Sequence, residues 1–208
     1  MPIEPIVYTV EEQALIHAVV GRGEGWDCPD LNPLRSRIKR FYLQGQDFCC
    51  CYCRKQNLVQ HGRAWDIEHV IARALNAAFL FEPENLAVSC IDCNVAKRDT
   101  GVLARQRQAF PRDSAAYTIV HPHFDDWDQH FMFGGVVYVP LTAKGAETIK
   151  VCQLYRFYAL QGQDALCIND RRYIALAERA LFAKTPDEAE PSVLAMRGLI
   201  QAAKDDRA

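Results

Sequence analysis

Apolar residues recur at helical spacing near the start of the chain, which predicts two helices. Residues 9–20 begin with Thr9 and Glu12 in the arrangement of a capping box and continue with apolar residues every three or four positions. A second helix is expected from Asn32, with a proline in its first turn, to about Gly45. The glycine-rich stretch between the two helices is expected to be a loop.

The second half of the chain mixes short apolar runs with helical patterns. Residues 131–140 place two glycines between apolar runs, which predicts a β-hairpin, and the β-branched residues 117–120 suggest another short strand. Helical spacing then returns in residues 147–160, 170–184 and 191–204. The pattern as a whole predicts an α+β fold.

Composition places the chain among ordinary globular proteins. Of its 208 residues, 50% are hydrophobic and 24% are charged, which is enough apolar material for a packed core. No apolar run is long enough to cross a bilayer, and the N-terminus has neither the basic stretch nor the long apolar run of a signal peptide. We therefore expect a cytoplasmic protein with no membrane partner.

The net charge of −2 conceals an uneven distribution along the chain. Residues 35–113 carry 13 Lys and Arg against 8 Asp and Glu, which gives +5, and the remainder carries 11 against 18, which gives −7. A basic segment suits a phosphate-binding surface. The acidic flanks argue against strong binding to nucleic acid outside a specific site.

Six of the nine cysteines fall in two short clusters. Cys50 with Cys53, and Cys90 with Cys93, each form a Cys-x-x-Cys pair. Two such pairs can supply four thiolates to a tetrahedral Zn²⁺, and metal binding is the expected use of clustered thiols in a chain without an export signal. A closed four-thiolate site leaves no position for substrate, so this zinc would be structural. A redox pair or buried free thiols is the alternative.

Between the two cysteine pairs and directly after the second lie a histidine, carboxylates and amides that suit phosphodiester hydrolysis. That reaction needs a base to activate water and a cation to hold the charge that develops on the phosphate. His69 falls near the end of a predicted strand and can be neutral at working pH, which makes it the expected general base. Glu68 and Asn94 offer the oxygen ligands that Mg²⁺ or Mn²⁺ prefer, so we expect them to hold a catalytic ion.

This constellation resembles the HNH endonucleases, members of the His-metal finger (ββα-metal) group, in the subset whose treble-clef core is stapled by two cysteine pairs. The matching residues are the four cysteines, Glu68-His69, Asn85-Leu86, Asn94 and Lys97.

The resemblance implies a zinc-stapled finger over residues 47–110, between an N-terminal helical segment, residues 1–46, and a hairpin-plus-helices region, residues 111–208. In the family, the middle residue, here Asn85, braces the loop and fixes the catalytic histidine by hydrogen bonding. The family also implies products with a 5′ phosphate and a 3′ hydroxyl.

Two positions depart from the commonest pattern of that family. Glu68 stands where Asp or His is frequent, and Asn94 stands where many members have His. Because Glu is one methylene longer than Asp, Glu68 is expected to bind the ion through water, or Asp66 to share the task.

Basic residues beside the finger are the expected nucleic-acid contacts. Lys97 and Arg98 follow Asn94 on the helix after the last cysteine, and Arg37 and Arg40 belong to a basic run on the second helix. A solvated helix face is the alternative for each of them. DNA is the expected substrate, although phosphate contacts alone do not separate DNA from RNA.

Residues 121–130 gather three histidines and three acids. Capping and hydrogen bonding at turns is the preferred interpretation, and a second metal site is the alternative. This segment, with the hairpin, glycine and helix that follow, also loosely resembles the HNH subunit of Septu-type phage-defence systems. That resemblance implies a part in antiviral defence and a partner ATPase that docks on the C-terminal helices.

Two further hypotheses stay open. A non-catalytic treble-clef zinc module would bind nucleic acid or protein without needing His69, Asn85 and Asn94 together. A nuclease that is silent until a partner positions it would also fit the acidic flanks.

Overall fold

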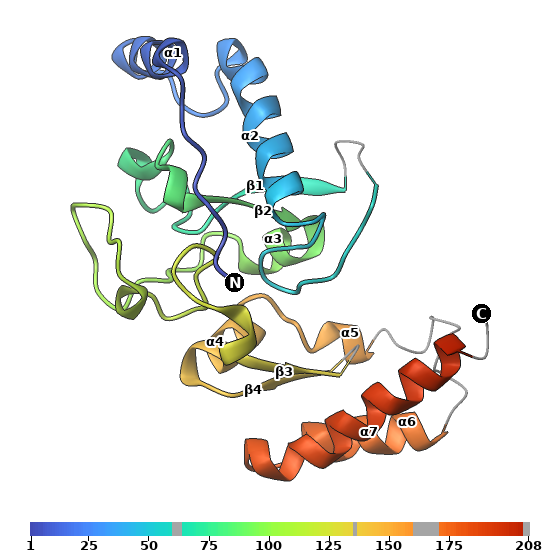
Figure 1. Ribbon diagram of the computed structural model, residues 1–208. Helices are drawn as coiled ribbons and strands as arrows, with labels where there is room; N and C mark the ends of the chain where they lie inside the picture. The colour runs from blue at the N-terminus through green and yellow to red at the C-terminus, as the bar shows by residue number, and fades with distance from the viewer. Residues whose placement is uncertain (60–63, 135–136, 160–170, 206–208) are drawn as a thin grey trace. The chain divides into compact units, whose positions relative to one another are not determined.

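The computed structural model describes residues 1–59, 64–134, 137–159 and 171–205 and has a mixed α and β fold (Figure 1). The chain divides into two compact units, Met1–Asp126 and Trp127–Ala208. The first unit contains the expected N-terminal segment and finger, and the expected boundaries after residues 46 and 110 stay predictions. Within the described residues, no helix combines the length and the apolar character needed to cross a membrane.

The first unit begins with the two predicted helices, α1 (Val10–Gly21) and α2 (Asn32–Gly45). The Thr9 hydroxyl accepts a hydrogen bond from the Glu12 amide at 3.3 Å, and the Glu12 carboxylate accepts one from the Thr9 amide at 2.9 Å. This reciprocal pair is the predicted capping box, and a cap of this kind stabilises a helix by ~1 kcal/mol. The apolar face of α2 is buried, which fixes the helix against the rest of the unit.

The finger consists of two antiparallel strands and a helix, in the predicted ββα order. Strands β1 (Trp65–His69) and β2 (Leu86–Cys90) pair with Trp65 opposite Cys90 and His69 opposite Leu86. Helix α3 (Ile91–Lys97) begins directly after β2 and packs against both strands (Figure 1). This arrangement brings the end of β1 next to a helix that is distant in sequence.

The turn that carries Cys50 and Cys53 is tied to β2 by a buried side chain. Gln46, just after α2, donates through its amide nitrogen to the carbonyls of Cys49 and Val88, and its amide oxygen accepts from the Val88 amide at 2.9 Å. These three bonds hold the first cysteine pair beside the strand that ends at Cys90.

Short 3₁₀ turns complete the connections of the chain: η1 (Pro29–Leu31), η2 (Ala77–Phe79), η3 (Pro83–Asn85), η4 (Ser114–Ala116) and η5 (Trp127–Gln129).

The second unit contains the predicted β-hairpin followed by helices. Its elements are β3 (Phe131–Phe133), β4 (Tyr138–Pro140), α4 (Ala143–Val151), α5 (Arg156–Ala159), α6 (Arg171–Leu181) and α7 (Pro186–Asp205). A core of Val, Ala, Tyr and Met side chains from Val137, β4, α6 and α7 holds the unit together. Gly134 belongs to this packing, because a Cβ there would meet the Met196 side chain at 3.1 Å.

Three expectations for the second half need correction. Residues 117–120 form no strand, and Tyr117 makes only an isolated bridge with Leu103. The helix expected over 147–160 is two helices, because α4 ends at Val151 and α5 begins at Arg156. The last helix begins at Pro186 rather than at Pro191, which lies inside it. Gly135 and Cys167 fall outside the described residues.

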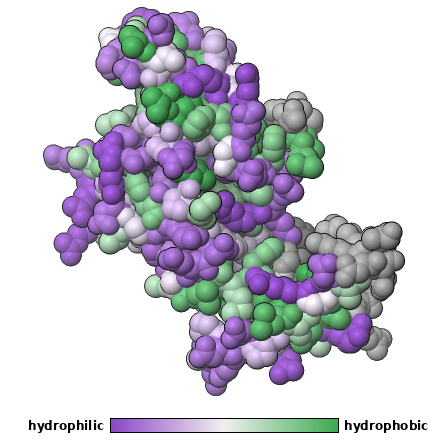
Figure 2. Space-filling view, in the orientation of Figure 1, coloured by the Kyte–Doolittle hydropathy of each residue, from purple (hydrophilic) through white to green (hydrophobic). Residues whose placement is uncertain are grey.

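Hydrophilic side chains cover most of the face of the first unit that Figure 2 shows, with hydrophobic residues in small patches between them. Such a surface is ordinary for a globular unit, since scattered exposed apolar residues are normal.

Candidate functional site: a four-cysteine cluster and a basic cleft

The four cysteines of the two Cys-x-x-Cys pairs form one cluster. The sulfur atoms of Cys50, Cys53, Cys90 and Cys93 all lie within 4.8 Å of one another, and Cys53 and Cys90 are 3.9 Å apart. A tetrahedral Zn²⁺ with Zn–S bonds of about 2.3 Å requires sulfur atoms roughly 3.8 Å apart. The four thiols therefore fit a zinc ion. They would fill all four coordination positions of that ion and leave none for a substrate.

His69 lies at the end of β1 with its ring almost completely buried, at 6% exposure. Its Nε2 is 3.0 Å from the carbonyl oxygen of Leu80. Because a carbonyl only accepts, this bond requires a proton on Nε2 and leaves the lone pair of the neutral ring on Nδ1. The Trp26 ring packs edge-on against the imidazole, with ring centroids 4.5 Å apart.

Burial lowers the pKa of His69 to about 4, because the charged imidazolium loses its solvation. The Leu80 carbonyl opposes this shift, and the charges of Arg73 and Lys97 add to it. The imidazole is therefore neutral across the physiological range.

Asn85 closes the loop between β1 and β2. Its side-chain oxygen accepts from the Ile71 amide at 2.7 Å, and its amide nitrogen donates to the carbonyls of Ile71 at 3.1 Å and Phe79 at 3.0 Å. All three bonds are buried, and they fix the segment that presents the Leu80 carbonyl to His69. Asn85 is thus a brace for the loop whose carbonyl orients the imidazole.

Asp66 and Asn94 meet across the finger. The Asn94 amide nitrogen donates to the Asp66 carboxylate at 2.8 Å, which joins β1 to α3. Both residues line the same cleft as His69. Carboxylate and amide oxygens are ligands that Mg²⁺ and Mn²⁺ accept, so this pair fits a hard divalent cation.

Glu68 takes a different position from the one expected of a metal ligand. Its carboxylate is 2.7 Å from the Lys97 ammonium and accepts the Tyr52 hydroxyl at 2.9 Å, and its side chain is 1% exposed. Burial raises the pKa of Glu68, while Lys97 and the Tyr52 hydroxyl favour the charged carboxylate. Glu68 already has a cation as partner, so Asp66 is the better placed of the two acids to hold a metal ion.

Lys97 is likewise not placed to contact a substrate. Its side chain is 1% exposed, and its ammonium also donates to the His69 carbonyl at 3.0 Å. Burial with an acidic partner satisfies the charge inside the protein, so Lys97 does not present its ammonium to a phosphate as expected. Arg98, the next residue, is exposed and lines the cleft.

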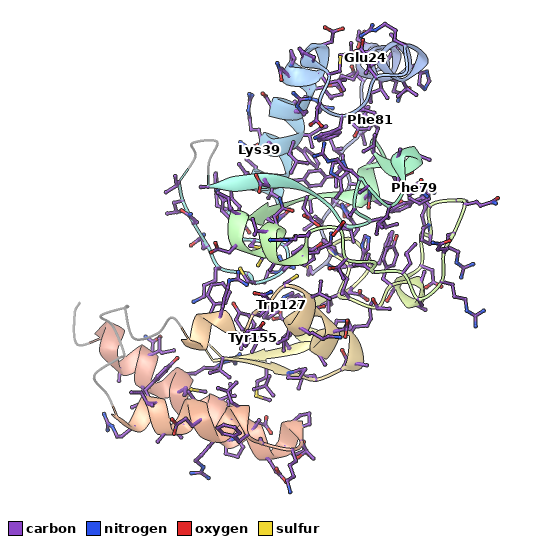
Figure 3. All side chains as sticks on the ribbon, turned by 180° about the vertical axis from the view of Figure 1, so that it is seen from behind. Glu24, Lys39, Phe79, Phe81, Trp127 and Tyr155 are labelled. Carbon is purple, nitrogen blue, oxygen red and sulfur yellow. The ribbon has the colours of Figure 1, made fainter. Side chains whose placement is uncertain are left out.

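The cleft has a volume of about 660 Å³ and brings α2, β1 and α3 to one surface of the first unit. Four of its lining residues are basic: Arg35, Lys39, Arg73 and Arg98. Figure 3 shows Lys39 on the part of α2 next to β1. Burial lowers the pKa of Lys39, and the charge of Asp66 opposes that shift. The cleft thus combines four basic residues with His69, Asn94 and three acids, Asp66, Glu68 and Asp99.

The expected contacts Arg37 and Arg40 do not line this cleft. Arg37 pairs with the Glu12 carboxylate and donates to the Val7 carbonyl at 3.0 Å, and Arg40 is exposed elsewhere on α2. Arg35 and Lys39 face the cleft instead, because residues four apart share a helix face. Helical spacing counted from Asn32 would have placed Arg35 and Lys39 on a different face of the helix from Arg37.

Trp26 is a site residue that the sequence did not indicate. It lies in the glycine-rich loop before α2, and Arg35 donates to its carbonyl and, at 3.2 Å, to that of Cys28. Arg73 adds an exposed ion pair with Asp27 of the same loop at 2.9 Å. A large aromatic residue among glycines is the one sequence signal that this loop carries.

Comparison with family models, with curated proteins and with solved structures finds no match to this chain. The chemistry of the cleft has to follow from its own residues.

Asp125, the His121 backbone and the His123 ring make hydrogen bonds within the first unit. Asp125 accepts from the His121 amide at 2.7 Å and from the Ser114 hydroxyl at 2.5 Å. The ring of His123 lies 3.0 Å from the Ile3 carbonyl and 2.8 Å from the Leu86 carbonyl. In the described part of the chain, the four cysteines are the only group of three or more His, Cys, Asp or Glu side chains that lie close enough together to hold a metal ion.

Proposed function

We propose that this protein is a metal-dependent HNH endonuclease that hydrolyses phosphodiester bonds of DNA. The observation that carries the proposal is that His69, Asp66 and Asn94 line one cleft together with four basic side chains. A base, hard oxygen ligands and basic groups for phosphate are the parts that phosphodiester hydrolysis needs. The four-cysteine cluster supplies a rigid frame beside them.

In this proposal His69 is the general base. Its Nε2 proton is committed to Leu80, so the Nδ1 lone pair takes the proton of the attacking water. Burial keeps the ring neutral at working pH. Asn85 acts on His69 through the loop that it braces.

Asp66 and Asn94 would hold the Mg²⁺ or Mn²⁺ ion. The ion supplies positive charge to the phosphate oxygens and to the departing 3′ oxygen. The residues present fit such an ion in donor type, since they offer carboxylate and amide oxygens and no thiol. Lys39 and Arg98 would hold the phosphates on either side of the scissile bond, beside Arg35 and Arg73, which also bond the loop at Trp26 and Asp27.

The resemblance of the finger to HNH endonucleases supports the same proposal and adds the expected products, a 5′ phosphate and a 3′ hydroxyl. The looser resemblance of residues 121–130 and beyond to the HNH subunit of Septu-type systems extends it to phage defence. In that extension, a partner ATPase docks on the C-terminal helices.

A non-catalytic treble-clef zinc module is the competing function. It would need the four cysteines and the basic groups but not a histidine with a fixed tautomer or an asparagine that braces its loop. These two features favour the nuclease.

Cleavage of an end-labelled DNA duplex with Mg²⁺ or Mn²⁺ tests the proposal through the ends that it leaves. We expect fragments that a DNA ligase can rejoin, because ligation needs a 5′ phosphate and a 3′ hydroxyl. A folded, zinc-loaded protein that binds the duplex without cutting it would favour the binding module.

A further inference from the structure

A buried chain of polar groups runs from the zinc cluster to His69. Tyr52 stands between the ligands Cys50 and Cys53, and its hydroxyl donates to Glu68 at 2.9 Å. The Lys97 ammonium meets the same carboxylate oxygen at 2.7 Å and donates to the His69 carbonyl at 3.0 Å. Tyr52, Glu68 and Lys97 are each 1% exposed, so water does not compete for these bonds.

Tyr52 and Lys97, the two groups that bond Glu68, are both placed by cysteines of the four-cysteine cluster. Tyr52 lies within the Cys-x-x-Cys turn, and its backbone position follows from Cys50 and Cys53. Lys97 lies four residues after Cys93 on α3, so both side chains fall on the buried face of the same helix. Any movement of the zinc cluster would therefore move both groups that hold Glu68.

Glu68 and His69 are neighbours in β1, but their side chains lie in different surroundings. Glu68 is held by Tyr52 and Lys97, whereas the His69 ring lies against Trp26 and the Leu80 carbonyl. Lys97 therefore touches β1 at two points, the Glu68 carboxylate and the His69 carbonyl. Two buried bonds from one ammonium limit the rotation of the backbone that carries the imidazole.

We propose that Tyr52, Glu68 and Lys97 are positioning residues that transmit the geometry of the zinc cluster to the imidazole of His69. The inference rests on the proposed role of His69 as general base. It assigns the zinc site a part in catalysis beyond folding, because a shift of about 1 Å in a reacting group can cost ~100-fold in rate. None of the three residues contacts the substrate in this account.

Tyr52→Phe is the sharpest test, since it removes one oxygen atom and keeps the ring that fills the core. We expect one zinc per chain and a near-normal Tm, with kcat about tenfold lower, KM unchanged and a shifted NMR resonance of the His69 imidazole. The matched control is Tyr117→Phe, which removes another hydroxyl bond of the first unit, from Tyr117 to the Pro111 carbonyl at 2.8 Å. This control should leave kcat and the imidazole resonance unchanged.

The double variant Glu68→Gln/Lys97→Met removes both buried charges together, which avoids leaving one of them without a partner. We expect it to lower kcat more than Tyr52→Phe does, with KM again unchanged. Normal kcat and a normal imidazole resonance in the two variants would overturn the proposal, and so would a loss of kcat that only follows the loss of zinc.

The imidazole resonance separates this inference from the proposed function. If the wild-type protein cuts no nucleic acid, the proposed function fails. The response of the His69 resonance to Tyr52→Phe then still decides whether the zinc cluster positions the ring. A spectrum of His69→Gln assigns that resonance.

Discussion

The Asn94 amide donates a hydrogen bond of 2.8 Å to the Asp66 carboxylate, across 28 positions of sequence. The bond joins the helix after the last cysteine to the strand that ends at His69, and it places an amide and a carboxylate together at the cleft. Glu68 lies closer to His69 in sequence, yet it is buried with Lys97. Of the two acids, Asp66 is therefore the one that our proposal assigns to the metal ion.

Asp66→Asn should weaken metal activation of the proposed nuclease. The substitution keeps the size of the side chain but removes the charge that attracts a divalent ion. We expect the Mn²⁺ concentration for half-maximal cleavage to rise by at least about tenfold, the size of loss found on removing even an outer-shell partner of a metal site.

Asp99→Asn is the matched control for that titration, because Asp99 is another acid that lines the cleft. Its Mn²⁺ requirement should stay close to the wild-type value. An equal rise for both variants would mean that the overall charge of the cleft, not a ligand at Asp66, sets the metal requirement.

Loss of one thiolate should remove the zinc and much of the stability of the first unit. In Cys90→Ser we expect less than one zinc per chain by elemental analysis and a Tm lower by about 10 °C or more, because structural zinc contributes directly to folding. Cys49→Ser is the control, since Cys49 is outside the four-cysteine cluster. Equal zinc contents in the two variants would contradict the assignment of the ligands.

The free energy of unfolding should fall as the pH drops from about 6.5 towards 4. Burial lowers the pKa of His69 to about 4, so this residue binds more protons in the unfolded chain than in the folded one in this window, while Glu68, whose pKa burial raises, acts in the opposite direction. This part of the free energy of unfolding is thus fully present above the unfolded pKa of ~6.5. It is lost progressively as the pH falls to the folded pKa of about 4. The contribution of His69 alone is on the order of 3 kcal/mol.

Urea unfolding at pH 5 and pH 7 measures this effect. His69→Gln should show a smaller loss of stability between the two pH values than the wild type. His17→Gln, on the exposed face of α1, should show the wild-type loss. Equal pH dependence in His69→Gln and the wild type would show that His69 does not titrate in this way.

Basic residues of the cleft should set the salt dependence of DNA binding. Lys39→Gln/Arg98→Gln should lower affinity and reduce the slope of log K against log salt by about 0.9 for each phosphate group that the variant no longer neutralises. Arg40→Gln/Arg105→Gln removes the same charge from positions outside the cleft and should change the slope less. An equal change in both variants would place the bound nucleic acid elsewhere.

Local patterns predicted much of the fold because they depend on residues close in sequence. The capping box at Thr9 and the spacing of the four cysteines specify geometry within a few residues, and both are present in the structure. The strand predicted over residues 117–120 was wrong because β-branched residues form a strand only when a partner strand pairs with them. The backbone pairing here is a single isolated bridge from Tyr117 to Leu103.

The cleft was harder to predict because its chemistry depends on long-range partners. Nothing in the sequence near Glu68 shows that Lys97 lies 2.7 Å from its carboxylate, or that Arg37 is paired with Glu12. The packing of Trp26 on His69 likewise joins a loop before α2 to the end of β1. These contacts follow from how α2 and α3 pack on the two strands, which local spacing does not encode.

Cleavage of supercoiled plasmid DNA tests the central claim most directly. Purified zinc-loaded protein is incubated with the plasmid and Mg²⁺ or Mn²⁺, beside His69→Ala and an EDTA control. We predict cutting by the wild type that EDTA abolishes and that His69→Ala lacks, although the variant keeps its fold and its zinc. Full cutting by His69→Ala would contradict the role of His69 as the base.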